Sequence, residues 1–160
     1  MVKFLGSLVL AAGLAVSAGA SATTHDLGSL PSGSSSITET VGPGSFSDII
    51  DFTIGSKSFV GAGVGASNVV IFGSSVFDIA NLTMSIYNSA NVKIGSGTDI
   101  NLGVLGAGNY YAVVTGKATG SVGGVYTEAF SVRAVPEAST WAMMLAGLGM
   151  LFFAAKRRKV

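Results

Sequence analysis

Few side chains in this sequence have the types and spacing that catalysis requires. His25 is the only histidine, and cysteine is absent. A Ser–His–acid triad needs a positioned imidazole, whereas His25 closely follows a predicted signal-cleavage site, where we expect a solvated side chain at a frayed terminus. Multi-histidine metal sites, Cys-ligated zinc and a thiol nucleophile are therefore excluded, and carboxylates are the remaining catalytic candidates.

Asp48 and Asp51 lie three residues apart, and paired carboxylates can hydrolyse glycosides. In a strand this odd spacing places them on opposite faces, so they do not converge. Asp48 falls on the apolar face with Phe46 and Ile50, where an unpartnered carboxylate is costly. We expect it near a sheet end, accepting hydrogen bonds from the backbone N–H groups of a loop. Calcium ligation and catalysis are the alternatives, although calcium needs about six to eight oxygens.

Two glycine-rich segments resemble cofactor or metal motifs only in part. The segment GAGVGA (61–66) fits G-x-G-x-x-A, but no helix is predicted after it, as a dinucleotide site requires. The segment GSGTD (95–99) is similar to a calcium-binding repeat but occurs once, and such repeats need stacking. We therefore expect a turn or bulge at the first segment, a turn at the second, and no metal or cofactor.

Three tyrosines could offer stacking surfaces for sugars, although aromatic side chains in strands more often pack into a core. They are Tyr110, Tyr111 and Tyr126. Residues 23–135 contain four basic and seven acidic residues, a net charge of −3. This balance argues against a nucleic-acid partner, because phosphate contacts need clustered Lys and Arg.

The same 113 residues are enough for one small domain. Short segments rich in Val, Ile, Phe, Thr and Tyr alternate with Gly, Asn and Ser, and several have the apolar–polar alternation of a half-buried strand. We predict an all-β fold, a small antiparallel β-sandwich of jelly-roll type. The predicted strands are 37–41, 46–54, 57–63, 68–73, 81–88, 100–105, 109–117 and 124–134, with turns at Asn68, Asn88, Asn91, 95–97 and 106–108.

Residues 1–22 have the organisation of a secretory signal peptide: Lys3, an apolar stretch over 4–16, and small residues over 17–22. Cleavage by signal peptidase fits after Ala20 or after Ala22. The body that follows is therefore expected outside the cytoplasm.

The chain ends in an uncharged stretch, 141–155, and a basic cluster. At about 1.5 Å per residue the stretch spans roughly 22 Å, short of a bilayer core of about 30 Å. A tryptophan at one end and cations at the other nevertheless suit a membrane helix with a cytoplasmic tail. The predicted anchor residues are Trp141, Leu145, Leu148, Leu151, Phe152 and Phe153, and the basic stop is Lys156, Arg157, Arg158 and Lys159.

Val135, Pro136 and Glu137, followed by this apolar span and basic tail, resemble the PEP-CTERM sorting signal, which here covers 136–160. The resemblance implies a Gram-negative exported protein, held in the inner membrane until an exosortase, a membrane-embedded cysteine enzyme, cleaves near the motif. Ala138 stands where the motif has its second proline. A protein that keeps the tail as a permanent anchor is therefore the alternative.

Residues 45–54, with Phe46, Asp48 and Phe52, resemble the segment that names the FxDxF group of PEP-CTERM proteins. That resemblance implies a small exported protein without an established activity. The leading hypothesis is a non-enzymatic protein of the cell surface or of the exopolysaccharide matrix of a biofilm. A carbohydrate-binding module or adhesin is the alternative and requires exposed tyrosine rings. A carboxylate hydrolase would require two acids within about 10 Å in a cleft.

Overall fold

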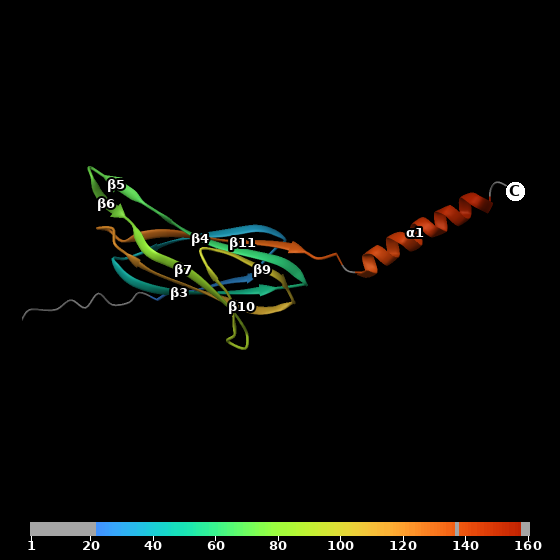
Figure 1. The fold of residues 1–160 in the computed structure, drawn as a ribbon, viewed down its shortest axis with the longest axis horizontal. Helices are drawn as coiled ribbons and strands as arrows, with labels where there is room; N and C mark the ends of the chain where they lie inside the picture. Colours follow the sequence, from blue (N-terminus) through green and yellow to red (C-terminus); the bar gives the residue numbers. More distant parts are fainter. Residues whose placement is uncertain (1–21, 137, 158–160) are drawn as a thin grey trace, which may run out of the picture.

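The computed structural model describes residues 22–136 and 138–157, and it shows two β-sheets packed face to face with one long helix beyond them (Figure 1). One sheet has the strand order β1-β3-β10-β7-β8 and the other β2-β11-β4-β9. The predicted all-β sandwich is confirmed. The strands are β1 (Thr24–Ser29), β2 (Gly33–Val41), β3 (Gly44–Ile54), β4 (Ser58–Ser67), β5 (Val69–Ile71), β6 (Ser74–Phe77), β7 (Ile79–Asn88), β8 (Lys93–Gly97), β9 (Asp99–Leu105), β10 (Gly108–Ala118) and β11 (Gly124–Ala134), and the helix is α1 (Ala138–Arg157).

The core is formed by the alternating apolar residues of the two sheets. Phe52 of β3 lies with its ring centroid 4.9 Å from that of Phe130 on β11, in the facing sheet. Phe46 stacks on Tyr126 of the same facing strand at 5.3 Å. Each fully buried side chain of this kind contributes about 1.5–3 kcal/mol. The predicted inward face of β3 is therefore correct.

Three strands, β1, β6 and β8, were not predicted from the sequence. β1 pairs in parallel with β3, an exception among antiparallel pairings. β8 contains residues 95–97, so the predicted turn there is wrong. A Cβ on Gly95 would lie 2.6 Å from the Ile100 side chain, so this glycine permits close approach of β9 rather than a reversal of the chain.

The segment 61–66 lies inside β4, so a turn there is also wrong. The pairing of β4 with β9 does shift register between Val60 and Gly61, but the extra residue is Leu102 on β9, so the expected bulge lies opposite this segment rather than within it. Residues 68–73 form β5 and a turn, not one strand. Phe72 and Gly73 have φ values of 51° and 80°, which the two-residue hairpin to β6 requires.

Candidate functional site

The C-terminal segment leaves the sandwich abruptly. β11 ends at Ala134, and the backbone N–H of Val135 still donates a 3.0 Å hydrogen bond to the carbonyl of Lys57. Pro136 is exposed, and α1 begins at Ala138. Glu137, the remaining residue of the predicted sorting motif, lies outside the described residues. Very little chain therefore separates the folded sheet from the helix.

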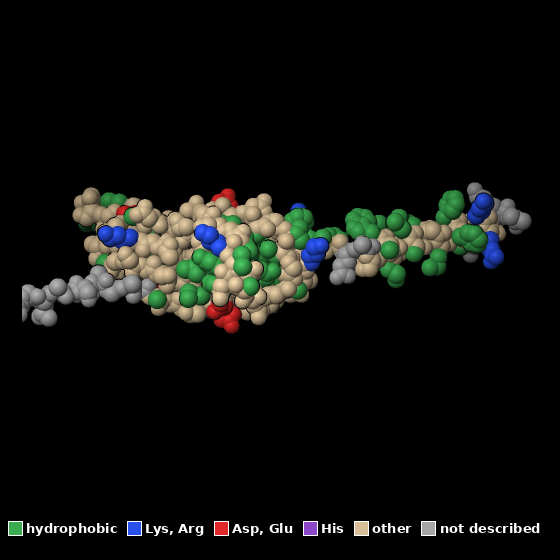
Figure 2. Space-filling model, turned by 60° about the horizontal axis from the view of Figure 1, so that its bottom comes forward, with side chains coloured by type: hydrophobic (Ala, Val, Ile, Leu, Met, Phe, Trp, Pro, Cys, Tyr) green, Lys and Arg blue, Asp and Glu red, His purple; other side chains and the backbone are tan. Residues whose placement is uncertain are grey.

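The apolar surface of α1 is not covered by the sandwich. All of its apolar window is solvent-exposed, and the helix is long and apolar enough to cross a membrane. Figure 2 shows hydrophobic side chains along its length and basic side chains at its far end. The six predicted anchor residues are between 56 and 75% exposed: Trp141, Leu145, Leu148, Leu151, Phe152 and Phe153.

The helix is longer than the 141–155 span expected from the sequence. Its 20 residues rise about 30 Å, close to the thickness of a bilayer core, and this length includes the two basic residues of the last turn. Lys156 and Arg157 lie in its last turn, and the Arg157 guanidinium is 5.7 Å from the Phe153 ring centroid. Arg158 and Lys159 lie outside the described residues. The arrangement suits a membrane anchor with a cationic end.

At the other end of the domain, Thr23 is the residue at which the chain joins the sheet. Its carbonyl accepts a 2.8 Å hydrogen bond from the N–H of Ile49 on β3. Ala22 is exposed, and Ala20, the other candidate cleavage residue, lies outside the described residues.

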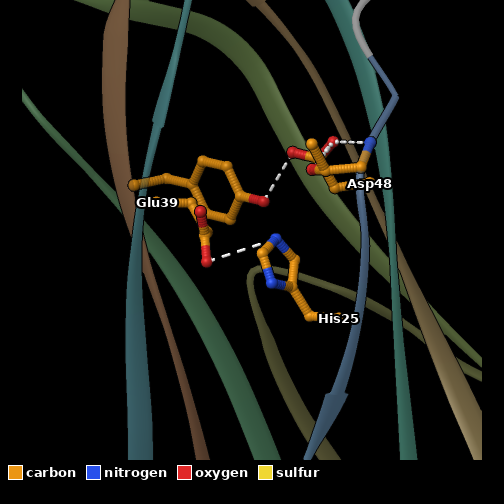
Figure 3. Close-up of polar contacts among 5 residues, drawn as sticks. His25, Glu39 and Asp48 are labelled. Atoms are coloured by element: carbon orange, nitrogen blue, oxygen red, sulfur yellow. Dashed lines mark hydrogen bonds and ion pairs between the residues drawn. The ribbon is translucent and has the colours of Figure 1, made fainter.

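Asp48 is fully buried between the sheets and has three hydrogen-bond donors. Its Oδ1 accepts from the Thr23 backbone N–H at 2.8 Å and from the Thr23 hydroxyl at 2.5 Å. Its Oδ2 accepts from the Tyr126 hydroxyl at 2.7 Å (Figure 3). A backbone donor was predicted correctly. The predicted place was wrong, because Asp48 lies within β3 rather than at a sheet end and its partners come from the chain start and the facing sheet.

Further ionisable groups share this part of the interior. His25 Nε2 lies 3.3 Å from Glu39 Oε1, although without hydrogen-bond alignment. Glu128 is fully buried, and neither of its carboxylate oxygens has a partner. Burial, with the nearby charges of Glu39 and Asp48, raises the Glu128 pKa to about 7. We call His25, Glu39, Asp48, Tyr126 and Glu128 the interior polar cluster.

His25 is therefore neither solvated nor frayed, contrary to the sequence prediction. It lies on β1, half-buried, because β1 pairs with β3 and turns alternate residues inward. Among the described residues, no group of three or more His, Asp and Glu side chains is arranged to hold a metal ion. The two central carboxylates of the interior polar cluster, Asp48 and Glu128, are closed to solvent.

The three tyrosines considered for sugar binding differ in exposure. Tyr126 is fully buried, so it cannot stack on a ligand. Tyr110 stacks on Phe52 and donates to the carbonyl of Gly106 at 3.0 Å. Tyr111 stacks on Tyr87, its register partner on β7, with ring centroids 5.0 Å apart. Sequence reasoning missed Tyr87, and the signal that could have found it is the antiparallel pairing of 81–88 with 109–117.

Asp26 and Asp51 meet where β1 pairs with β3 in parallel register. Both are exposed and line an open hollow of about 290 Å³ with Asn109 and Tyr110. Asp26 already accepts a 2.8 Å hydrogen bond from the N–H of Gly28, as in an Asx turn. Two acids are therefore adjacent, as the hydrolase hypothesis requires, but at a strand pairing that the sequence did not predict.

Two solved structures are similar to the sandwich. One is PliG of Aeromonas hydrophila, a periplasmic inhibitor of g-type lysozyme, at 12% identity and a TM-score of 0.48, over 72% of this chain and all of that one. The other is the pre-peptidase C-terminal domain of a Bacillus anthracis collagenase, at 15% identity and a TM-score of 0.44, over 69% of this chain and 94% of that one. No curated protein matches this chain in sequence.

Residues 134–159 match the PEP-CTERM protein-sorting motif. The match begins at the last residue of β11 and covers the linker, the whole of α1 and all four residues of the basic stop. It coincides with the one helix that the described part of the chain offers for a membrane span. The chain therefore carries a PEP-CTERM sorting motif, which implies an exported protein that is held by a membrane anchor and targeted by an exosortase.

Proposed function

We propose that this is a non-enzymatic protein of the cell surface or extracellular polysaccharide matrix. The export signal and the sorting motif deliver it, and the β-sandwich is the part that remains after processing. Signal peptidase and an exosortase-like enzyme are its processing partners. The protein is then a substrate of these two enzymes at its two ends, and the β-sandwich between them is a compact structural module.

The observation that carries this proposal is the position of the sorting motif relative to the fold. The motif starts at the last residue of the sandwich and contains an apolar helix that the sandwich does not bury. A soluble domain does not leave such a helix exposed to water, because each exposed large apolar side chain forgoes about 1.5–3 kcal/mol. A bilayer supplies the apolar surroundings until cleavage separates helix and domain.

The test is the mass of the mature protein in a host with an exosortase and in the same host lacking it. We expect a chain that ends near Pro136, found outside the cell, only in the host with exosortase. Signal peptidase acts in both hosts, so the N-terminus is the internal control. A chain that keeps α1 in both hosts would show a permanent anchor and would contradict release.

A polysaccharide-binding module is the second candidate, and the Tyr87–Tyr111 pair favours it. These rings lie on the outer face of the sheet formed by β7 and β10, and the Tyr111 hydroxyl donates to Asn91 Oδ1 at 3.1 Å. Aromatic rings beside amides are suited to sugar rings and hydroxyls.

Affinity electrophoresis in gels containing the host's exopolysaccharide tests this candidate. Replacing both tyrosines with alanine should abolish retardation. Phe59→Ala is the matched control, because Phe59 is exposed on the other sheet, under the Arg133 guanidinium. Equal mobility of all three proteins with and without polysaccharide would dismiss the binding role.

A further inference from the structure

The interior polar cluster has more acids than cations. Asp48 and Glu128 are fully buried, and Glu39 is largely buried. The ion-pair contact found among the described residues of the sandwich is that of Glu39 with His25. Buried carboxylates are normally paired with a cation or with several donors, because an uncompensated buried charge is strongly destabilising. The three donors to Asp48 are neutral groups, so a cation beside Asp48 would offset this excess of acids.

Thr23 occupies the place where that cation would be effective. Its backbone nitrogen is 2.8 Å from Asp48 Oδ1, and its hydroxyl donates to the same oxygen. Its carbonyl is fixed by the N–H of Ile49. The hydroxyl and carbonyl contacts of Thr23 therefore fix its nitrogen against a fully buried carboxylate. Ala22, the residue just before it, is exposed.

We propose that the export signal is removed at the Ala22–Thr23 bond, and that the freed α-ammonium group of Thr23 forms an ion pair with Asp48. Hydrolysis consumes one water: the leaving peptide takes the new carboxylate of Ala22, and the Thr23 nitrogen becomes an amine that binds a proton. A neutral N–H···O contact then becomes a charge-assisted one, which is roughly twice as strong.

The geometry distinguishes this bond from the other site that fits the sequence. Cleavage after Ala20 would leave Ser21 and Ala22 in front of Thr23, whose nitrogen would stay a neutral amide. The charge would then lie two residues away, up to about 7 Å further along the chain. Both sites satisfy the small-residue rule for signal cleavage, but only cleavage after Ala22 creates the cation at the atom that contacts Asp48.

The first test compares chains that run from Thr23 or from Ala22 to Val160, each released in detergent from a fusion partner by a protease that leaves no extra residue. We expect the equilibrium constant for urea unfolding to be at least about tenfold smaller for the Thr23 start. In the Asp48→Asn background the two starts should agree within about twofold. Equal stability of the two starts with Asp48 present would overturn the proposal.

Asp48→Asn could prevent folding, so acetylation of the α-amino group provides a second measurement with Asp48 intact. Acetylation should raise the unfolding constant of the Thr23 start by about tenfold and leave that of the Ala22 start within about twofold. The intact mass of the exported protein should show Thr23 as the first residue, and a chain that begins at Ser21 would refute the assignment. The inference rests on the export signal of the proposed function but not on exosortase, so its failure would leave C-terminal sorting untouched.

Discussion

Tyr126 on β11 donates a 2.7 Å hydrogen bond to Asp48 on β3 and so links the two sheets inside the core. Both residues are fully buried, and the Tyr126 ring also stacks on Phe46. Burial and the hydrogen bond to Asp48 raise the Tyr126 pKa well above its usual range, so the hydroxyl remains a donor. Tyr126 thus joins the two sheets both by a buried hydrogen bond and by aromatic packing.

Removing the Tyr126 hydroxyl tests how much this link contributes. Tyr126→Phe should lower the free energy of unfolding by about 1–3 kcal/mol, because a buried carboxylate loses a donor while the ring packing stays. Tyr111→Phe is the matched control, since its hydroxyl bonds Asn91 near the surface, and it should cost no more than about 0.5 kcal/mol. Urea denaturation measures both, and similar losses for the two variants would contradict the prediction.

The buried, unpartnered carboxylate of Glu128 predicts that stability falls as pH rises. In the unfolded chain Glu128 has the ordinary glutamate pKa of about 4.5, and in the folded precursor its pKa is about 7. Between these values the folded state binds more protons, so stability present at pH 4.5 is lost by pH 7, with an upper limit of about 3 kcal/mol. Asp48, Glu39, Tyr126 and His25 face the same cluster.

Glu128→Gln should flatten this profile whatever its absolute effect on stability. Urea denaturation at several pH values between 4.5 and 8 provides the measurement. Asp51→Asn is the control, because Asp51 is an acid exposed on the outer face of β3, outside the interior polar cluster. An unchanged slope in Glu128→Gln would assign the pH dependence to other members of the interior polar cluster.

Gly123 has a backbone conformation that other residues rarely adopt, and its surroundings leave no room for a side chain. Its φ is +124°, and an added Cβ would lie 2.0 Å from the carbonyl oxygen of Val41. Gly123→Ala should therefore cost about 2–4 kcal/mol through strain and displacement of β2. Gly65→Ala, in the open part of β4, should change stability by less than about 1 kcal/mol. Thermal unfolding of both variants decides, and a stable Gly123→Ala protein would show that β2 can shift.

Ala138 is the first residue of α1 and stands at the second proline position of the PEP-CTERM motif. Proline is well tolerated at the first position of a helix, because its missing N–H has no partner there. Ala138→Pro should thus preserve the helix and increase the fraction of chain released in a host with exosortase. Ala142→Pro, one turn later, is the control that should break the helix and reduce membrane retention. Immunoblots of membrane and medium fractions give both numbers, and unchanged release in Ala138→Pro would show that this position does not limit processing.

The sequence predicts those parts of the fold in which residue chemistry and periodicity agree. The alternation of Phe46, Ile50 and Phe52 places β3 correctly in the core, since burial of apolar side chains dominates its energetics. β1 has no such alternation, because its inward positions include His25. Its stability comes from pairing with β3 and from Thr23, and such long-range contacts are not readable from local pattern.

For the interior polar cluster, the sequence predicted the inward position of one residue but not the residues that contact it. The inward position of Asp48 followed from its spacing with Phe46, and a need for donors followed from burial. The donors themselves, Thr23 and Tyr126, lie 25 and 78 residues away in the chain, so sheet topology brings them together. The inward position of Glu128 was missed, although Tyr126 and Phe130, two residues to either side of it on β11, give the same spacing signal as Phe46 gives for Asp48.

The hydrogen bond from Val135 to Lys57 has a consequence for the lifetime of the released protein. In a body cleaved before Thr23 and near Pro136, the N-terminal residue is hydrogen-bonded to Asp48 and the C-terminal residues are hydrogen-bonded to the sheet, so neither terminus extends into solvent. Exopeptidases need an extended terminus that can enter their active sites, and here such a terminus would have to peel from a sheet first. We therefore expect the processed body to resist digestion by aminopeptidases and carboxypeptidases in the extracellular medium, because both cleavage sites lie directly beside hydrogen-bonded strands.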